Sequence, residues 1–254
     1  MDLGLHGKTA LITGGSRGIG RAIALAMAAE GCNVAICARD ADQLHATTLE
    51  LEALDAQPLG VVADVTSEAD LQRVVQATAD RFGSIHVLVN NVGGSRGGRT
   101  PTDDDWQASV DINLFSTIRA TRLVLPYMEQ QRYGRIINIA SIYGRESGGN
   151  PAYNATKASV ISFSKSLALQ VASQGITVNS LCPGSISFPG GSWARRVEQD
   201  PAGMAEFVKR EMPMGRFGRA EEIAAVAVFL ASEQASLLTG AAVNVDGGQS
   251  RSLI

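Results

Sequence analysis

The segment near the start of the chain alternates an apolar strand, a glycine-rich turn, a helix and a second apolar strand. Residues 8–13, which are apolar or β-branched after Lys8, have the pattern of a strand and run into the turn Gly-Gly-Ser-Arg-Gly-Ile-Gly at 14–20. Residues 21–30 are typical of a helix that Gly31 ends, and residues 33–37 form the next strand. A strand–helix–strand unit pairs its strands in parallel, so this segment constrains the fold more than any other.

The glycine turn favours binding of a dinucleotide. Glycine adopts positive φ and lets a phosphate approach the backbone. The following helix N-terminus offers free N–H groups and a positive dipole end. The spacing is G-x-x-x-G-x-G and not the common G-x-G-x-x-G, and tight packing alone would also explain it. The strand–turn–helix context favours a pyrophosphate site, with candidate residues Gly14, Ser16, Arg17, Gly18, Ile19 and Gly20.

The same alternation continues through the whole chain. Further apolar runs occupy residues 59–63, 85–89, 135–140, 176–181 and 242–245, which makes seven strands with the first two. Helical stretches between them predict a parallel sheet with helices on both faces. A chain of 254 residues, 45% of them hydrophobic, suits one α/β domain over residues 1–254, and no repeat or linker marks a boundary.

A second motif lies in Pro-Ala-Tyr-Asn-Ala-Thr-Lys. Tyr153 and Lys157 are four residues apart, so a helix would place both side chains on one face. A cation beside a phenol stabilises the phenolate and lowers the tyrosine pKa. The pair would therefore donate and accept a proton near neutral pH.

These two motifs, in this order, make the chain resemble the short-chain dehydrogenase/reductase family from Gly7 to about Gly248. Further marks of the family follow in sequence order: Asp64-Val65, Asn90-Asn91-Val92-Gly93, Asn113 in Asp-Ile-Asn, Ser141, and Pro183-Gly184. The resemblance implies a Rossmann-like, doubly wound sheet in the order 3-2-1-4-5-6-7. Ligands of such sheets bind beyond the carboxyl ends of the strands, where most of these marks fall. Asp64 as a helix cap and Asn91 as a turn closure are the plainer alternatives.

The resemblance also implies roles for individual residues. Tyr153 passes a proton to or from the substrate oxygen, and Lys157 lowers its pKa and holds the nicotinamide ribose. Ser141 orients the substrate oxygen, and Asn113 holds a water that relays protons from Lys157. Ser141 as a cap and Asn113 facing solvent are the structural alternatives. The remaining cofactor contacts implied are Asp64 and Val65 at the adenine, together with Asn91, Gly93, Pro183, Gly184 and Ile186.

The end of the second strand favours NADP(H) over NAD(H). An acidic residue there binds the ribose 2′-OH and repels a 2′-phosphate. Here the matching position is Ala38, followed by Arg39, and Arg17 lies in the glycine turn. Two guanidinium groups would clamp a 2′-phosphate. The alternative is a solvated Arg39 with Asp40 turned toward the ribose.

The chain departs from the family pattern at three places. Val92 replaces a common alanine. Phe188 stands where a threonine often follows the Pro-Gly motif, so a hydrogen bond to the cofactor carboxamide is either missing or supplied by Ser187. Residues 188–213 form a longer segment than is usual. Glycines around Trp193 make it a candidate substrate lid over an apolar pocket.

Bulk properties exclude several classes of function. A net charge of −3 without a basic block does not suggest nucleic-acid or membrane-surface binding. Cys32, Cys37 and Cys182 lack metal spacing, so we expect no metal and interpret them as small buried residues in a reducing compartment. The sequence contains no signal peptide and no long apolar run, which favours a cytoplasmic protein.

The leading hypothesis is an NADPH-dependent reductase of a small ketone or aldehyde, reversible toward the alcohol. Many relatives with these motifs are 3-oxoacyl-[acyl-carrier-protein] reductases. Arg195, Arg196, Lys209 and Arg210 would suit an acidic carrier, but acidic residues alternate with them and indicate a solvated helix face. The alternatives are an NAD-dependent alcohol dehydrogenase and a non-catalytic NADP(H)-binding sensor. The complete Asn113, Ser141, Tyr153, Lys157 set argues against the sensor.

The chain is also expected to form a homotetramer. Two helical stretches around Asn113 and Tyr153 are apolar on more than one face and need more cover than one sheet gives. The residues are Leu114, Phe115, Ile118, Ala155, Ala158, Val160, Ile161, Phe163, Leu167 and Ala168. The last strand, at 242–245, would form a second interface, which gives dihedral symmetry. The alternative is that these residues are ordinary core.

Overall fold

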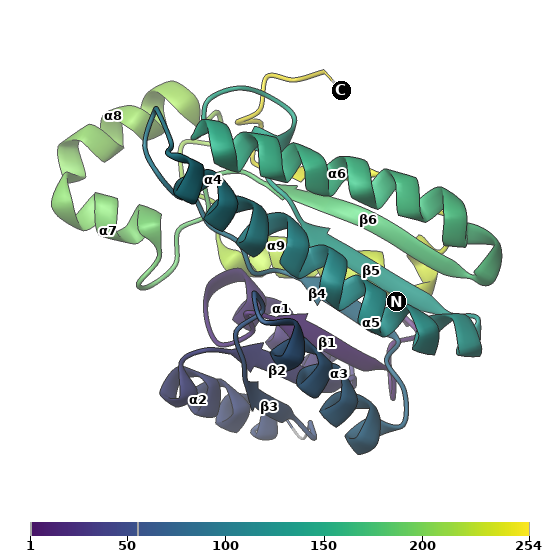
Figure 1. Cartoon of the computed structure of the whole chain (residues 1–254). Helices are drawn as coiled ribbons and strands as arrows, with labels where there is room; N and C mark the ends of the chain where they lie inside the picture. Colours follow the sequence, from purple (N-terminus) through teal and green to yellow (C-terminus); the bar gives the residue numbers. More distant parts are fainter. Residues whose placement is uncertain (1, 55, 254) are drawn as a thin grey trace.

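A seven-stranded parallel sheet in the order β3-β2-β1-β4-β5-β6-β7 forms the centre of the molecule (Figure 1). The structure, a computed structural model, describes residues 2–54 and 56–253. The strands are β1 (Thr9–Thr13), β2 (Asn33–Ala38), β3 (Leu59–Val62), β4 (Val87–Asn90), β5 (Gly134–Ile139), β6 (Ile176–Pro183) and β7 (Ala242–Val245). The predicted strands and their order are confirmed, and their ends shift by at most two residues.

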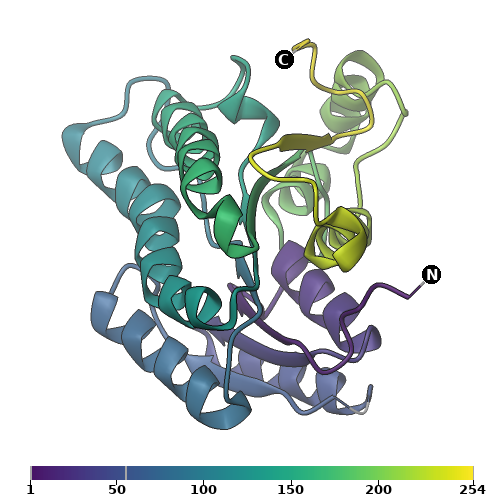
Figure 2. The same ribbon diagram turned by 90° about the vertical axis from the view of Figure 1, so that its right-hand side faces the viewer.

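Helices cover both faces of the sheet (Figure 2). One face carries α1 (Gly18–Ala29), α2 (Ala41–Glu52) and α9 (Ala220–Ala231), and the other carries α3 (Glu68–Phe82), α5 (Ser116–Gln131) and α6 (Pro151–Val171). Side chains alternate along each strand, so Ile12 of β1 packs in the first core and Leu11 in the second. The five inner strands are buried on both faces, which explains their long apolar runs, whereas the edge strands β3 and β7 are only partly buried.

Two helices differ from their predicted extents. The helix expected at 21–30 begins at Gly18, so Gly18–Gly20 form its first turn. The helical stretch expected around Asn113 is three elements: α4 (Asp103–Val110), a π-helical turn η1 (Asp111–Phe115) and α5. A π-turn has the residue pattern of an α-helix, so the sequence does not distinguish them.

The segment that follows β6 forms two helices, α7 (Ser192–Gln199) and α8 (Pro201–Glu211), which extend away from the sheet in Figure 1. Short 3-10 turns complete the chain: η2 (Ile142–Gly144), η3 (Ala172–Gln174) and η4 (Glu233–Ala235). Among the described helices, none combines the length and apolarity required to cross a bilayer.

Candidate active site

The glycine turn between β1 and α1 is built for close approach of a ligand. Gly14 has a φ of +66°, and its N–H donates to Cys37 O at 2.8 Å. A side chain at Gly20 would collide with the carbonyl oxygen of Gly14, so only glycine packs there. Arg17 occupies the N-cap of α1 without a capping hydrogen bond from its side chain. The first N–H groups of α1 are thus left without a side-chain cap, which fits the anionic pyrophosphate of a dinucleotide.

Asn91 holds this turn in place from the neighbouring strand. Its Nδ2 donates to Thr13 O at 3.0 Å and to Gly14 O at 3.1 Å. Its backbone N–H donates to Thr13 Oγ1 at 3.0 Å. Asn91 therefore closes the turn, and it supports the predicted cofactor site by shaping the backbone of Gly14.

At the end of β2, Arg39 and Asp40 are both exposed, but only the Asp40 side chain is engaged as a helix cap. Both carboxylate oxygens of Asp40 bond Gln43, one accepting its N–H at 3.0 Å, so Asp40 caps α2. The Arg39 side chain is 70% exposed and lies 3.9 Å from Asp64. Asp64 also accepts hydrogen bonds from Thr66, and the backbone N–H of Thr66 is the main cause of its lowered pKa. The arrangement leaves a guanidinium, not a carboxylate, available to a ribose substituent.

Helix α6 begins at the residue that positions the tyrosine. The Asn150 side chain accepts hydrogen bonds from the N–H groups of Ala152 and Tyr153, and Pro151 follows it at the first helical position. One turn later, Lys157 Nζ lies 5.8 Å from the Tyr153 ring centroid. The ammonium donates to Ile139 O at 2.7 Å, which anchors it at the end of β5.

Ser141 follows β5 directly and meets the same tyrosine. Its hydroxyl is hydrogen-bonded to Tyr153, and its Oγ also accepts the backbone N–H of Tyr143 at 3.1 Å. Ser141 therefore caps η2, which was the alternative to a catalytic role, and it also contacts Tyr153. Both roles leave its side chain beside the phenol.

Burial controls the pKa values of this pair. Burial raises the pKa of Tyr153 above its ordinary value, although the hydrogen bond from Ser141 opposes the shift. Burial lowers the pKa of Lys157 to about 8. The expected lowering of the Tyr153 pKa by Lys157 is therefore wrong: the pKa is raised, because burial disfavours the charged phenolate. Below pH 8 the pair consists of a neutral phenol and an ammonium, which is the form that donates a proton.

Asn113 is fully buried and does not face solvent. It lies in the π-turn η1, a feature that often marks functional sites. Its Oδ1 accepts Gly94 N–H at 3.0 Å, and its Nδ2 donates to Gly94 O and Ser109 O, both at 2.9 Å. A Cβ at Gly93 would lie 2.7 Å from Asn113 Oδ1 and 2.8 Å from Lys157 Nζ. Gly93 therefore leaves the space in which Asn113 and Lys157 come together.

The remaining predicted cofactor residues line the end of β6 and the lid. Pro183 ends β6, and the next residue, Gly184, donates its N–H to Val245 O at 3.2 Å. Ile186 is buried and forms an isolated bridge with Gly218. The Phe188 ring packs over the glycine turn, where a Cβ at Gly18 would lie 2.6 Å from it. The candidate lid segment therefore contacts the glycine turn directly.

The aromatic residues of the lid pack on one another. Trp193 stacks on Phe207 with centroids 4.9 Å apart and lies 5.2 Å from Phe217. The Arg196 guanidinium lies 4.8 Å from the Trp193 ring centroid. Trp193 therefore holds α7 and α8 together.

The sequence predicted an apolar pocket around Phe188 and Trp193, whereas the cavity of about 680 Å³ found in the structure is lined by neither; it is bordered by Tyr143, whose backbone N–H bonds Ser141 Oγ. Its lining comes from η2 and the loop after it, from α8 and from residues near the end of the chain: Ile142, Tyr143, Glu146, Ser147, Gly148, Phe207, Arg210, Glu211, Gln249, Arg251 and Ser252. The only signal in the sequence was that Ile142 and Tyr143 directly follow Ser141.

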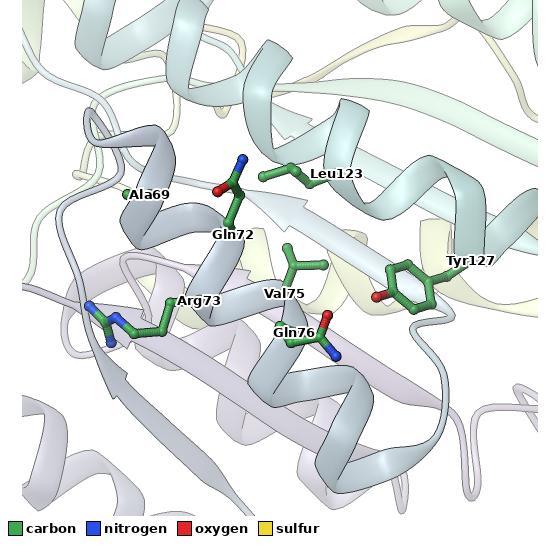
Figure 3. A pocket seen from close by; sticks show the side chains of 7 residues that line it. All are labelled: Ala69, Gln72, Arg73, Val75, Gln76, Leu123 and Tyr127. Carbon is green, nitrogen blue, oxygen red and sulfur yellow. The ribbon is translucent and has the colours of Figure 1, made fainter.

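A second hollow of about 530 Å³ lies between α3 and α5 (Figure 3). It is lined by Ala69, Gln72, Arg73, Val75, Gln76, Leu123 and Tyr127. None of these is a candidate site residue, so this hollow is separate from the chemistry described above.

The interpretation of the cysteines as buried residues is confirmed. Cys32, Cys37 and Cys182 are free and buried, and burial raises their pKa values to about 12, 12 and 11. Within residues 2–54 and 56–253, no group of three or more histidine, cysteine or acidic side chains could hold a metal ion.

Comparison with known proteins agrees with this geometry. The family model described as Enoyl-(Acyl carrier protein) reductase matches residues 14–250. The chain is 39% identical to the 3-oxoacyl-[acyl-carrier-protein] reductase FabG of Escherichia coli (strain K12), covering 97% of this chain and 98% of the relative. It is 36% identical to a hydroxy(phenyl)methylsuccinyl-CoA dehydrogenase subunit, BbsD, of Thauera aromatica, covering 98% of each. The structure of L-sorbose reductase from Gluconobacter frateurii with NADPH and L-sorbose superposes with a TM-score of 0.93 at 35% identity, covering 100% of both chains.

Proposed function

The chain belongs to the short-chain dehydrogenase/reductase family of oxidoreductases, which interconvert carbonyl and alcohol groups, and we propose that it is an NADP(H)-dependent reductase of a ketone or aldehyde. The observation that carries the proposal is the convergence of Ser141, Tyr153 and Lys157 at the carboxyl end of β5. We propose that residues 1–254 act as one domain and that the protein is cytoplasmic.

The side chains divide the proposed reaction between them. The Ser141 hydroxyl donates a hydrogen bond to the substrate oxygen, and the Tyr153 hydroxyl delivers the proton to it. Lys157, tied to Ile139 O, keeps a positive charge beside the phenol as the proton leaves. When bound, the nicotinamide supplies the hydride. The reverse order of events oxidises the alcohol.

Asn113 would hold the loop at Gly94 and bind the water that returns a proton to Lys157. Its amide already bonds both backbone groups of Gly94. The glycine turn, Asn91 and Asp64-Val65 would hold the adenosine and the pyrophosphate, and Pro183-Gly184 with Ile186 would border the nicotinamide.

The preference for NADP(H) rests on the end of β2. Arg39 is exposed beside the ribose position, while Asp40 is engaged as the cap of α2. Arg17 lies exposed in the glycine turn and would share a 2′-phosphate with Arg39. The NADPH present in the L-sorbose reductase structure supports the same choice.

Turnover of a panel of ketones and aldehydes with NADPH tests the proposal, with Tyr153→Phe as the matched variant. The phenylalanine keeps the ring and loses only the hydroxyl. We expect turnover to fall by about 10² to 10⁴, the usual contribution of a general acid. NADPH affinity, titrated by fluorescence, should stay within about threefold, since the ring and the lysine remain. Activity of Tyr153→Phe within a few-fold of the parent would refute the assignment.

A further inference from the structure

Residues 246–253, here called the tail, lie against the loop that follows Ser141 and are fastened by one carboxylate. Glu146 Oε2 accepts hydrogen bonds from Ser250 Oγ at 2.9 Å, Arg251 N at 2.9 Å and Ser252 N at 3.0 Å. Three donors converge on one carboxylate oxygen, and hydrogen bonds to a carboxylate are stronger than those between neutral groups. Glu146 is thus the main attachment of the tail to the catalytic loop.

The tail makes two further attachments around the same site. Gln249 Oε1 accepts Ser185 N–H at 2.7 Å, and its Nε2 donates to Ser185 Oγ at 2.9 Å. Arg251 lies 4.0 Å from Glu211 of α8. The tail therefore joins three segments that border the site: the loop after β5, the loop after β6, and the lid.

The cavity is lined by the tail, by the loop after β5 and by α8. Tyr143 of that loop ties the lining to the serine, because its backbone N–H donates to Ser141 Oγ at 3.1 Å. Arg210 and Arg251, with side chains 69% and 81% exposed, form the outer rim. The size of about 680 Å³ is that of a typical small-molecule site. The cavity is therefore lined by apolar groups from Ile142, Tyr143 and Phe207 together with the charged side chains of Glu146, Arg210, Glu211 and Arg251.

We propose that Glu146 is a specificity-determining positioning residue that holds the tail as one wall of the substrate cavity. The occupant is a carbonyl compound with an apolar segment next to the carbonyl and a polar or charged far end. This inference rests on the proposed function, since Ser141 must mark the end that holds the carbonyl. Glu146 lines the cavity itself and, through its hydrogen bonds to residues 250–252, holds the tail beside it, but it touches no reacting atom.

Two ketones and three variants test the inference. The probes are 2-butanone and 7-oxooctanoate, which carries an apolar chain and a carboxylate. The variants are Glu146→Ala, a chain that stops after Gln249, and their combination. We expect each single change to lower the preference for 7-oxooctanoate, the ratio of the two kcat/KM values, by about tenfold, mainly through KM. The combination should lower it no further, because both changes remove the same wall.

Glu146→Gln is the conservative control, because its amide oxygen still accepts hydrogen bonds. It should keep the preference within about threefold of the parent. NADPH affinity should change little in all variants. The inference would be overturned if the effects of Glu146→Ala and of the truncation multiplied in the combined variant. It would also be overturned if neither change altered the preference for 7-oxooctanoate.

Amide hydrogen exchange gives a readout that does not need activity. The N–H groups of Arg251 and Ser252 donate to Glu146, so they should be protected in the parent and lose protection in Glu146→Ala. Unchanged exchange would overturn the inference by itself. If no carbonyl is reduced at all, the proposed function fails, and exchange still shows whether Glu146 fastens the tail.

Discussion

At the scale of single residues, the site depends on a lysine held where water is excluded. Lys157 is 3% exposed and keeps one fixed acceptor, the carbonyl oxygen of Ile139. Burial lowers its pKa to about 8, so it is charged below that pH and neutral above it. The Tyr153 phenol stays protonated over the same range, since its own pKa is raised.

This order of titration predicts how reduction depends on pH. Reduction needs a protonated Tyr153 and a charged Lys157, so kcat/KM with NADPH should fall as the pH rises through about 8. The measurement is kcat/KM from pH 6 to 10, which reports the pKa values of the free enzyme. A profile that is flat or rising to pH 9.5 would show that the charge of Lys157 is not required.

Arg39 carries the prediction on cofactor choice. Arg39→Asp replaces an attraction for the 2′-phosphate with a repulsion and offers an acceptor to a 2′-OH. We expect NADPH affinity to fall by about ten- to a hundredfold, the worth of a charge-assisted hydrogen bond, and NADH affinity to rise.

Fluorescence titration of both cofactors measures the change. Arg81→Asp on α3 is the control for altered net charge. An unchanged ratio of the two affinities in Arg39→Asp would mean that Arg39 does not contact the phosphate.

The sequence predicts which of these side chains come together better than it predicts their ionisation. Tyr153 and Lys157 were singled out from their spacing combined with the glycine turn near the start of the chain, and the structure brings them together on α6. The direction of the Tyr153 pKa shift could not be predicted, because it depends on burial by segments that are far away in the sequence. Glu146 was missed for a similar reason, since its partners lie 104 to 106 positions away.

At the scale of elements, the strands could be predicted because burial on both faces leaves a continuous apolar run. The π-turn η1 could not, since its residues fit an α-helix equally well. The lid was predicted as a segment, but its division into α7 and α8 and the stacking of its aromatic rings were not. Stacking depends on which aromatic rings come into contact in the folded chain, and these contacts cannot be predicted from the order of residues.

The lid gives a prediction at this scale. Trp193→Ala removes the ring contacts to Phe207 and Phe217. Each aromatic pair is worth about 0.5 to 1.5 kcal/mol, so the two together should raise local opening by about fivefold to a hundredfold.

Limited proteolysis within residues 188–213 measures the opening, because cleavage follows the population of the open form. Trp106→Ala on α4, the other tryptophan, is the control. Equal cleavage rates in the two variants would contradict the role given to Trp193.

At the scale of the whole molecule, exposed apolar side chains support the predicted homotetramer. Phe115 is 39% exposed and Leu169 on α6 is 71% exposed. Val160 and Ala168, two of the residues expected at the interface, are buried core instead. β7 is the last strand of the sheet, so one of its edges has no partner strand in the described chain.

Sedimentation equilibrium at micromolar concentration tests the tetramer. We expect a mass near four times the 26.6 kDa of one chain. Leu169→Arg should reduce the tetramer to a dimer, because it places a charge in the proposed interface between the α5 and α6 surfaces of two chains. Leu49→Arg on α2, which is also exposed, should leave the tetramer intact. If the unmodified protein has the mass of one chain, the tetramer is refuted. If it has the mass of two chains, only one of the two proposed interfaces forms.

The parallel ladder between β1 and β4 has a consequence for how the molecule reaches its native state. Ala10 of β1 pairs with Val87 of β4, so this contact forms only after a long loop has closed. High contact order of this kind slows folding. Asn91, which directly follows β4, holds the glycine turn in place. A folding intermediate without β4 therefore lacks the complete backbone of the proposed cofactor site. The cofactor would therefore retard unfolding of the native protein without accelerating its refolding.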